Sequence, residues 1–508
     1  MISFLHSAAV QGINACLIDV EVDISSGLPI FSIVGLPDTA VKESRDRVVS
    51  AIKNSGFDFP TKKITVNLAP ADIKKEGGLF DLPIALGIIA SSGTIAAKSL
   101  NKICAIGELS LDGKIRPVKG ILPIVLSLEK FGIRKIIVPE KNKYEAAVAK
   151  NIEVYPFGEL QEVVKFLKNE IQKVPFANGN IATHPEEFST TADFADIKGQ
   201  FFARRAAEVA SAGGHNMIMI GPPGSGKTMI AKRIPTILPP MSFEESVETT
   251  KIWSVSGLMQ AGESLVYQRP FRSPHHTTSS IALVGGGSYP KPGEVSLAHN
   301  GVLFLDELTE FKRDVLEVLR QPLEDKIVTV SRAKNTLTFP ASFMLIASMN
   351  PCQCGNYGSG AKECTCNPYQ VMKYRSKISG PLMDRIDIQV EVPALKIEEI
   401  TSEKNTDAEN SYNIKKRVVK ARHIQLERFK GKNMYCNAQM GPKEIKKYCL
   451  LDDKACILLK NAIEKLGFSA RAYDRILKVA RTIADLAASD IISAAHIAEA
   501  IKYRSLDK

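Results

Sequence analysis

Residues 219–234 read MIGPPGSGKTMIAKRI and are the most informative part of the chain. The stretch joins the apolar run NMIMI (216–220) to the helical segment TMIAKRI (228–234), in the order strand, glycine-rich loop, helix. It also matches the pattern GxxxxGK[ST]. Loops of this kind hold phosphates with backbone N–H groups and with the positive end of the following helix. The sequence therefore predicts a nucleotide site at the edge of an α/β sheet.

The expected phosphate loop consists of eight consecutive residues, Gly221, Pro222, Pro223, Gly224, Ser225, Gly226, Lys227 and Thr228. We expect Lys227 to contact the β- and γ-phosphates of ATP, because an ammonium group neutralises their charge. We expect the hydroxyl of Thr228 to bind Mg²⁺.

Two further apolar runs, GVLFLDE (301–307) and SFMLIASMN (342–350), also end at polar residues. Buried parallel strands show this pattern when their carboxyl ends carry a site. We expect Asp306 to complete the Mg²⁺ shell and Glu307 to activate the attacking water. Asn350 is expected to hydrogen-bond the γ-phosphate or that water.

The chain has 508 residues, which is too many for one ordinary hydrophobic core. Residues 1–167 mix short β runs with helices, and residues 168–191 resemble a linker because they lack any hydrophobic period. Residues 192–393 alternate strands and helices around a cysteine-rich insert at 352–366, and residues 394–508 are mainly helical. The predicted fold class is α/β multidomain.

The net charge of +11 favours an acidic partner, with nucleic acid as the first candidate. A merely basic protein without such a partner is the alternative interpretation. No apolar run reaches the roughly 18–20 residues that a membrane span needs. The N-terminus also lacks the basic start of a signal peptide. We therefore expect a cytoplasmic protein with no membrane partner.

Four of the nine cysteines are clustered as CxC–x9–CxC, at Cys352, Cys354, Cys364 and Cys366. Four thiolates suit a closed tetrahedral Zn²⁺ site, although the usual zinc knuckle is CxxC. Free thiols or a redox pair, and an iron–sulfur cluster, are the alternatives. The insert follows Asn350, so it is placed to brace a loop beside the nucleotide site.

The motifs DIKGQ (196–200), GPPGSGKT (221–228), FLDE (304–307), LMDRID (382–387) and SARAYDR (469–475) together resemble those of AAA+ ATPases. Residues 269–308 resemble the magnesium-chelatase-like and MCM-like branch of that superfamily. With the N-terminal region included, the whole chain resembles the ComM/YifB family of bacterial competence-associated proteins.

This resemblance implies roles for four more residues. Arg385 falls where the family carries an arginine finger, which acts on the nucleotide of a neighbouring subunit, and Arg471 falls where the lid places its second sensor. A guanidinium suits both roles because it stays charged, but a surface arginine in an ion pair is the alternative for each. Ile197 and Gln200 fall where the superfamily lines its adenine pocket. The resemblance also implies a homo-hexamer when ATP is bound.

Residues 1–167 resemble the Lon-type protease domain, a ribosomal-S5-domain-2-like α+β fold. Lon-type catalysis needs a serine nucleophile and a lysine base. On the family pattern these positions are Leu79 and Leu122, neither of which can attack or accept a proton. Nothing places Ser110 and Lys119 as a substitute dyad. We therefore expect a non-proteolytic scaffold.

Two segments are candidates for DNA contact. In the segment SRAKNTLTF (331–339), the resemblance implies a hairpin that points into a central pore, with Arg332 and Lys334 as phosphate contacts. A solvated hairpin tip is the alternative. The basic run 414–432 is the second candidate, although such runs are usually solvated helix faces. We expect His275 and His276 to serve structural hydrogen bonding rather than metal binding.

Taken together, the resemblance implies an ATP-driven DNA motor for branch migration of recombination intermediates, as in natural transformation. One alternative is a magnesium-chelatase-like motor subunit with a porphyrin-handling partner. Another is an ATP-dependent protease or protein remodelling factor, against which Leu79 and Leu122 argue.

Overall fold

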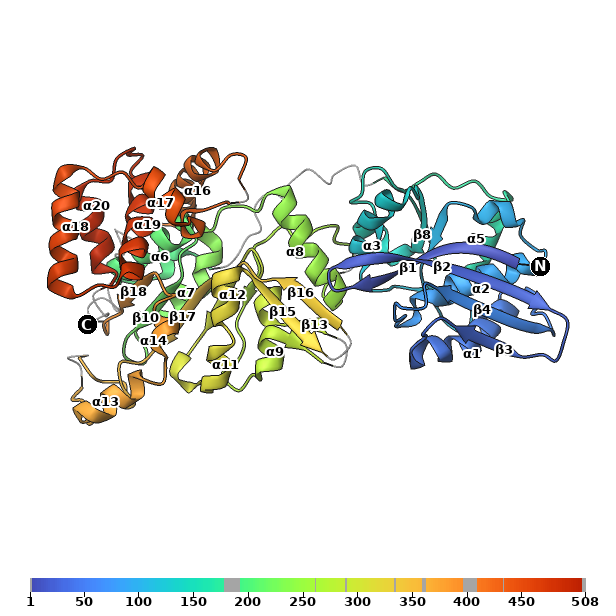
Figure 1. The fold of residues 1–508 in the computed structure, drawn as a ribbon, viewed down its shortest axis with the longest axis horizontal. Helices are drawn as coiled ribbons and strands as arrows, with labels where there is room; N and C mark the ends of the chain where they lie inside the picture. The colour runs from blue at the N-terminus through green and yellow to red at the C-terminus, as the bar shows by residue number, and fades with distance from the viewer. Residues whose placement is uncertain are drawn as a thin grey trace. The chain divides into compact units, whose positions relative to one another are not determined.

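The computed structural model describes residues 2–177, 192–260, 262–287, 290–332, 335–358, 362–395, 409–432 and 434–504. The chain forms two compact units, coloured along the chain in Figure 1. The first unit contains residues 1–186 together with 243–266. The second unit contains residues 187–242 together with 267–508. The chain therefore leaves the second unit once, adds a segment to the first, and returns.

A seven-stranded mixed sheet forms the centre of the first unit, in the order β3-β4-β2-β1-β5-β8-β9. Its strands are β1 (Ile2–Gln11), β2 (Asn14–Ser25), β3 (Phe31–Val34), β4 (Lys63–Ala69), β5 (Ile103–Ala105), β8 (Lys135–Pro139) and β9 (Glu153–Phe157). The long pair β1–β2 is antiparallel, whereas β5, β8 and β9 are parallel to one another. Ile18, Val20 and Val22 on alternate positions of β2 are fully buried, as expected for a strand with one face in a core.

The helices of the first unit are α1 (Thr39–Asn54), α2 (Asp81–Ser91), α3 (Ile121–Leu128), α4 (Lys143–Ala146), α5 (Leu160–Leu167) and α8 (Phe243–Ser256). A short two-stranded ribbon joins β6 (Glu108–Leu109) to β7 (Ile115–Arg116). Every residue of α2 is buried, so this helix is the centre of the core beneath the sheet.

Helix α8 lies within the range 192–393 expected for the nucleotide-binding core, but it packs in the first unit. The backbone N–H of Gly120, at the start of α3, donates to the carbonyl of Ser254 over 3.1 Å. The hydroxyl of Ser254 donates to Oε1 of Glu145 over 2.5 Å, and the N–H of Leu122 donates to the same oxygen over 3.0 Å. Burial raises the pKa of this carboxyl group, whereas the bonds from Ser254 and Leu122 lower it. The buried Glu145 thus joins α8 to α3.

A five-stranded parallel sheet forms the centre of the second unit, in the order β11-β14-β17-β10-β18. Its strands are β10 (Met217–Ile220), β11 (Phe271–Arg272), β14 (Val302–Leu305), β17 (Met344–Met349) and β18 (Ile388–Glu391). Two short hairpins accompany it, β12 (Gly285–Gly286) with β13 (Lys291–Pro292) and β15 (Ile327–Arg332) with β16 (Asn335–Pro340). The helices that accompany the sheet are α6 (Phe201–Gly213), α7 (Lys227–Ile237), α9 (Ser280–Val284), α10 (Glu294–Leu297), α11 (Arg313–Glu317), α12 (Arg320–Asp325), α13 (Pro368–Arg375) and α14 (Gly380–Met383).

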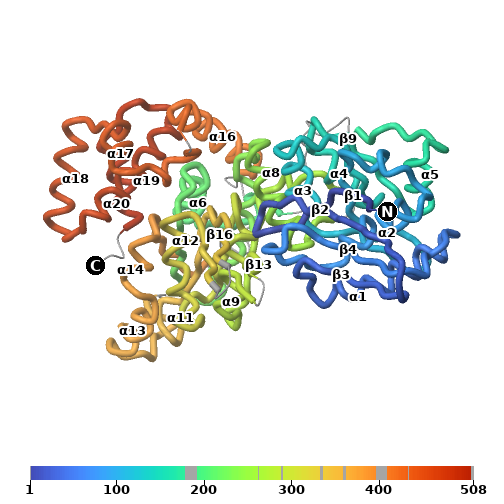
Figure 2. Tube along the Cα trace, turned by 45° about the vertical axis from the view of Figure 1, so that its right-hand side comes forward, coloured from blue at the N-terminus to red at the C-terminus, as the bar shows by residue number. Residues whose placement is uncertain are grey.

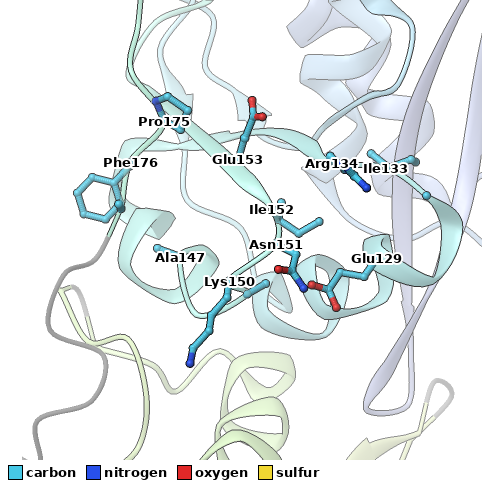
Figure 3. A pocket seen from close by; sticks show the side chains of 13 residues that line it. Glu129, Ile133, Arg134, Ala147, Lys150, Asn151, Ile152, Glu153, Pro175 and Phe176 are labelled. Atoms are coloured by element: carbon cyan, nitrogen blue, oxygen red, sulfur yellow. The ribbon is translucent and has the colours of Figure 1, made fainter.

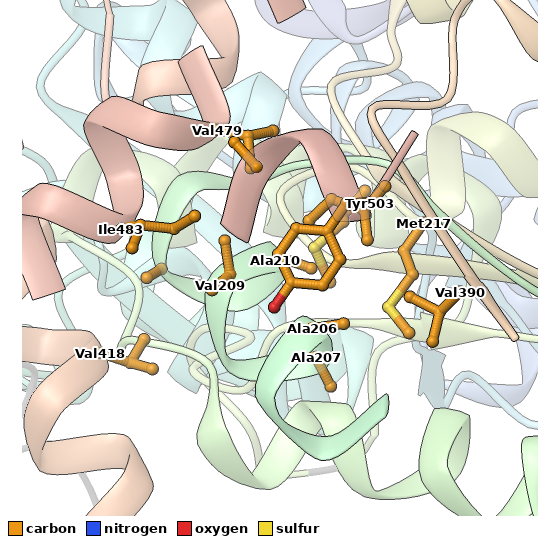
Figure 4. Packing of buried hydrophobic residues seen from close by; sticks show 14 of the residues in the cluster. Ala206, Ala207, Val209, Ala210, Met217, Val390, Val418, Val479, Ile483 and Tyr503 are labelled. Carbon is orange, nitrogen blue, oxygen red and sulfur yellow. The ribbon is translucent and has the colours of Figure 1, made fainter. Parts of the chain in front are cut away.

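The C-terminal part of the second unit is helical and packs on α6, as Figures 1 and 2 both show. Its helices are α16 (Ser411–Arg428), α17 (Pro442–Tyr448), α18 (Asp453–Leu466), α19 (Ala470–Leu486) and α20 (Ala494–Lys502). Small residues of α6, among them Ala206, Ala207 and Ala210, let the sheet and α19 pack against the helix (Figure 4). One continuous hydrophobic core therefore joins the sheet to the C-terminal helices.

The buried carboxylate of Asp387 links the five-stranded sheet to the C-terminal helices by polar contacts. It accepts hydrogen bonds from Nδ1 of His215 and from the N–H of Asn216, each over 3.3 Å, and it pairs with Arg475 of α19. Burial alone would raise the pKa of this carboxyl group. The opposing charges and hydrogen bonds of Arg475, His215 and Lys478 prevail and hold the pKa well below its usual range.

The α/β class, with a parallel sheet and a C-terminal helical region, is thus confirmed. The finer assignments, an S5-domain-2-like fold for residues 1–167 and a lid for residues 394–508, stay predictions. Within the described parts of the chain, no helix combines the length and the apolar character that a bilayer span requires.

Candidate nucleotide-binding site

The phosphate loop lies between the end of β10 and the start of α7. Gly224 and Gly226 have φ values of +77° and +91°, in the left-handed region that favours glycine. Gly221 is needed for another reason, because a Cβ there would lie 2.1 Å from the carbonyl oxygen of Val392. These glycines let the loop turn tightly beside the end of β18 and present its N–H groups at the N-terminus of an 11-residue helix.

The ammonium group of Lys227 lies inside this loop. Its Nζ donates to the carbonyl oxygens of Gly221 over 2.7 Å and Pro222 over 2.8 Å, and Oδ1 of Asn350 is 3.5 Å away. Burial lowers the pKa of Lys227, while the charges of Asp306 and Glu307 partly offset that effect. The cation is therefore held among polar atoms at the carboxyl edge of the sheet, where a phosphate would meet it.

Thr228 and Asp306 come together as a Mg²⁺ site requires. The hydroxyl of Thr228 donates to Oδ2 of Asp306 over 2.8 Å. The other carboxylate oxygen, Oδ1, accepts from the N–H of Glu307 over 3.1 Å and from the hydroxyl of Ser348. One carboxylate and one hydroxyl, both oxygen donors, match the hard ligands that Mg²⁺ prefers, and bound substrate phosphates and waters usually complete its shell.

Ser348 is a residue of this site that sequence reasoning missed. It belongs to β17, where Leu305 of β14 pairs with Ala347, so Asp306 follows at the level of Ser348. Its hydroxyl also accepts from the N–H of Glu307 over 3.3 Å. The signal was a lone hydroxyl in the otherwise apolar strand MLIASM, but only the strand register shows which carboxylate it meets.

The backbone of Glu307 is in the left-handed region, with φ of +52°, and 59% of its side chain is exposed. Nδ1 of His276 lies 3.7 Å from Oε2 of Glu307. The ring centre of His276 also lies 4.0 Å from that of His275, with the two rings tilted by 35°, and His276 meets Phe311 edge-on. Of the two histidines for which we expected structural hydrogen bonding, the structure places His276 beside the glutamate of the site.

The two residues expected in an adenine pocket lie just before α6. Ile197 is buried, and Gln200 donates through Nε2 to the carbonyl of Ser225 over 3.1 Å and to that of Pro393 over 2.7 Å. Gln200 thus ties the chain before α6 to the phosphate loop and to the end of β18. Its role toward adenine stays a prediction.

Arg385 and Arg471 lie in different surroundings. Arg385 donates to the carbonyl of Pro381 over 2.6 Å and pairs with Glu324 of α12, and 17% of its side chain is exposed. Arg471 is 66% exposed and lies 3.8 Å from the carboxylate of Asp384. Both make the ion pairs of the alternative interpretation, and their roles as finger and sensor stay predictions.

The predicted DNA hairpin exists as the antiparallel pair β15–β16, with Arg332 opposite Asn335 at its end. Lys334 and the side chain of Arg332 lie outside the described residues. Their roles as DNA contacts stay predictions.

Two arginines of the basic run 414–432 form ion pairs with acidic residues of neighbouring segments. Arg417 pairs with Glu208 over 2.6 Å and with Glu409, and Arg428 pairs with Asp485. Lys415, Lys416, Lys420 and Lys430 are exposed. The arginines therefore secure α16 against its neighbours, and the lysines form its solvated face.

The four clustered cysteines are brought together, with their sulfur atoms all within 4.8 Å of one another. A set of four thiols at this spacing fits a Zn²⁺ ion held by Cys352, Cys354, Cys364 and Cys366.

A groove in the first unit is a separate feature (Figure 3). Its lining combines the charged residues Glu129, Arg134, Lys150 and Glu153 with the ring of Phe176. Its residues belong to the first unit, whereas the phosphate loop belongs to the second.

Comparison with known proteins identifies relatives over the whole length. Residues 193–400 match the family described as "Magnesium chelatase, subunit ChlI", residues 20–142 match "Subunit ChlI of Mg-chelatase", and residues 408–504 match "Magnesium chelatase, subunit ChlI C-terminal". The chain is 45% identical to "Competence protein ComM" of Haemophilus influenzae, covering 99% of this chain and 98% of that protein. It is 44% identical to "Uncharacterized protein YifB" of Escherichia coli, covering 100% and 98%.

The chain belongs to the ComM/YifB family. The resemblance predicted from the motifs is therefore confirmed. A weaker similarity, 22% identity over 176 residues, links 32% of the chain to 21% of the Lon protease of Trichlorobacter lovleyi. The ComM/YifB family is a Mg-chelatase-like AAA+ family, which indicates ATPase activity with ATP and Mg²⁺. AAA+ proteins commonly form oligomers.

Proposed function

We propose that this protein is an ATP-driven, hexameric DNA motor that promotes branch migration of recombination intermediates in the cytoplasm. The observation that carries the proposal is the full-length, 45% identity to a competence protein, in a chain that assembles a phosphate loop and a carboxylate pair at one sheet edge. Competence is the uptake of DNA, and DNA taken up must be joined to a resident duplex. The net charge of +11 suits a polyanionic partner.

In this proposal each site residue has a separate role in ATP hydrolysis. Lys227 and the loop N–H groups bind and neutralise the phosphates, and Thr228 and Asp306 would hold Mg²⁺, whose charge would polarise the phosphate oxygens. Glu307 accepts a proton from the attacking water, and Asn350 orients that water or the γ-phosphate. Arg385 of a neighbouring subunit completes the site, so hydrolysis depends on the ring.

The proposed link from hydrolysis to DNA runs through the β15–β16 hairpin. In a ring, the hairpin of each subunit faces the pore, and Arg332 and Lys334 contact phosphates without reading sequence. Successive hydrolysis events then move the hairpins along the strand.

A branch-migration assay tests this proposal. Purified protein with ATP and a synthetic four-way junction should convert the junction to product duplexes, and branched or single-stranded DNA should stimulate its ATPase. The Lys227→Ala protein is the control. ATP hydrolysis without junction conversion or DNA stimulation contradicts the DNA motor.

The matches to magnesium chelatase subunits favour one second candidate, a chelatase-type motor subunit. That function predicts ATPase stimulation by a porphyrin-binding partner rather than by DNA. A protease is disfavoured because Leu79 and Leu122, at the expected serine and lysine positions, can neither attack nor accept a proton. A casein-type substrate added to the same ATPase assay tests that alternative.

A further inference from the structure

The sulfur atoms of the cysteine cluster are spaced like the ligands of one metal ion. Sγ of Cys352 lies 3.3 Å from that of Cys354 and 3.7 Å from that of Cys364, and the Cys354–Cys364 separation is 3.6 Å. All four cysteines are free. With a Zn–S bond of about 2.3 Å, a regular ZnS₄ tetrahedron has S···S edges of about 3.8 Å. The observed separations are close to that value.

The cluster lies directly beside the phosphate loop. Gly355 packs against the ring of Pro223, and a Cβ at Gly355 would lie 2.7 Å from Cδ of that proline. The backbone of Gly355 also has φ of +81°, so two separate reasons favour glycine there. The segment that carries Cys352 and Cys354 is thus in contact with a residue of the loop.

Further contacts hold the same segment to α13. Arg375 of α13 donates to the carbonyl of Pro351 over 3.2 Å, and its guanidinium lies 5.5 Å from the ring centre of Tyr357. The N–H of Tyr357 in turn donates to Sγ of Cys352 over 3.4 Å. Residues 351–357, which begin directly after Asn350, therefore contact both the phosphate loop and α13.

We propose that the four cysteines bind one structural Zn²⁺ ion, and that this ion supports nucleotide binding by holding residues 351–357 against the phosphate loop. Four protein ligands leave no open position for water, so the ion is structural rather than catalytic. Binding replaces the four S–H protons, which pass to solvent. The inference rests on the proposed nucleotide site but does not depend on DNA as the partner.

Metal content and spectroscopy test whether the four cysteines bind zinc. The full-length, reduced protein should contain about one Zn²⁺ per chain, and Cys352→Ser should lose it. Cys456→Ser is the matched control, because Cys456 is an exposed thiol on α18, and it should keep the metal. Co²⁺ substituted for Zn²⁺ should give the visible spectrum of a tetrathiolate site. Metal-free reduced protein, bound iron, or a disulfide among the four cysteines each overturns the zinc assignment.

Nucleotide affinity tests whether the zinc ion supports nucleotide binding. Cys352→Ser should weaken ATP binding by about tenfold, a typical size for coupling between two sites. Gly355→Ala keeps all four ligands but pushes on Pro223, so it should retain zinc and still weaken ATP binding. Lys227→Ala should lose ATP affinity with zinc unchanged, which separates a fault in the nucleotide site from a fault in the metal site.

Two outcomes overturn the coupling. One is a zinc-free, folded Cys352→Ser protein with wild-type ATP affinity. The other is a Gly355→Ala protein with both zinc and ATP affinity intact, and this variant decides the matter if Cys352→Ser does not fold.

Discussion

Lys227 and Glu307 are proposed to act in different steps at the same edge of the sheet, so their substitutions should separate binding from chemistry. Lys227→Ala removes the charge that meets the phosphates and should weaken ATP binding. Glu307→Gln keeps the shape of the side chain but removes the base, so ATP should still bind while turnover falls by about 10²–10⁴-fold. Nucleotide affinity and steady-state ATPase of both variants check this. Wild-type turnover in Glu307→Gln would remove Glu307 from its assigned role.

Ser348 allows a prediction at the metal ligands. Its hydroxyl bonds to Asp306 and accepts from the N–H of Glu307, so it orients both acidic residues. Ser348→Ala should raise the Mg²⁺ concentration needed for half-maximal ATPase by about tenfold, since residues that orient ligands typically have effects of this size. Ser376→Ala, on the exposed end of α13, is the control. An unchanged Mg²⁺ dependence would make Ser348 a packing residue only.

At the scale of elements, Asp387 joins the sheet, α6 and α19 and should give stability a specific pH dependence. Because its folded-state pKa is depressed, its contribution is present above the unfolded value of about 3.9 and is lost as pH falls below it. Asp387→Asn should cost about 3–5 kcal/mol at pH 7, since it removes the buried carboxylate and leaves the half-buried Arg475 without its partner. Urea unfolding of both proteins from pH 7 to pH 3 measures the difference, which should shrink on acidification. A constant difference would contradict the linkage.

The exposed lysines of α16 and its inward arginines should respond differently to substitution. Lys416→Ala with Lys420→Ala should flatten the salt dependence of DNA binding by up to about two units, with stability unchanged. Arg417→Ala should lower stability because the buried Glu208 then keeps Arg205 alone of these two arginine partners. Lys334→Ala should reduce junction migration more than ATPase. If the double lysine variant and Lys334→Ala both leave DNA binding and its salt slope at the wild-type level, neither α16 nor the hairpin carries DNA.

For the whole molecule, the central prediction is that the active site is shared between subunits. Lys227→Ala and Arg385→Ala proteins should each be inactive alone. Mixed, they should regain part of the ATPase, because some interfaces then combine an intact loop with an intact Arg385. Mass photometry with ATP, read beside the ATPase, should show hexamers. Fully active monomers would contradict this assembly.

The sequence predicted most reliably those features that depend on residues close together in the chain. The order of strand, glycine loop and helix around Lys227 predicted the local structure, and the apolar run before Asp306 predicted a strand of the same sheet. The approach of Ser348 to Asp306 depends on strand register, which a single sequence does not reveal. The inward direction of Arg417 depends on a partner more than two hundred residues away. The placement of α8 was missed for a similar reason, because a hydrophobic pattern shows that a helix is buried but not against which unit.

The placement of α8 determines where the chain can be divided into separately folding fragments. The polypeptide passes from the second unit to the first and back between residues 242 and 267, in addition to the passage near residue 186. Cutting the chain after residue 191 would leave α3 and Glu145 without the helix that covers them, and would leave α8 on the other fragment with its partner face exposed to solvent. A cleanly separable ATPase fragment must therefore omit residues 243–266 and close the gap with a short linker. A gene fusion or domain exchange that respects only the boundary near residue 186 is therefore expected to split the first unit.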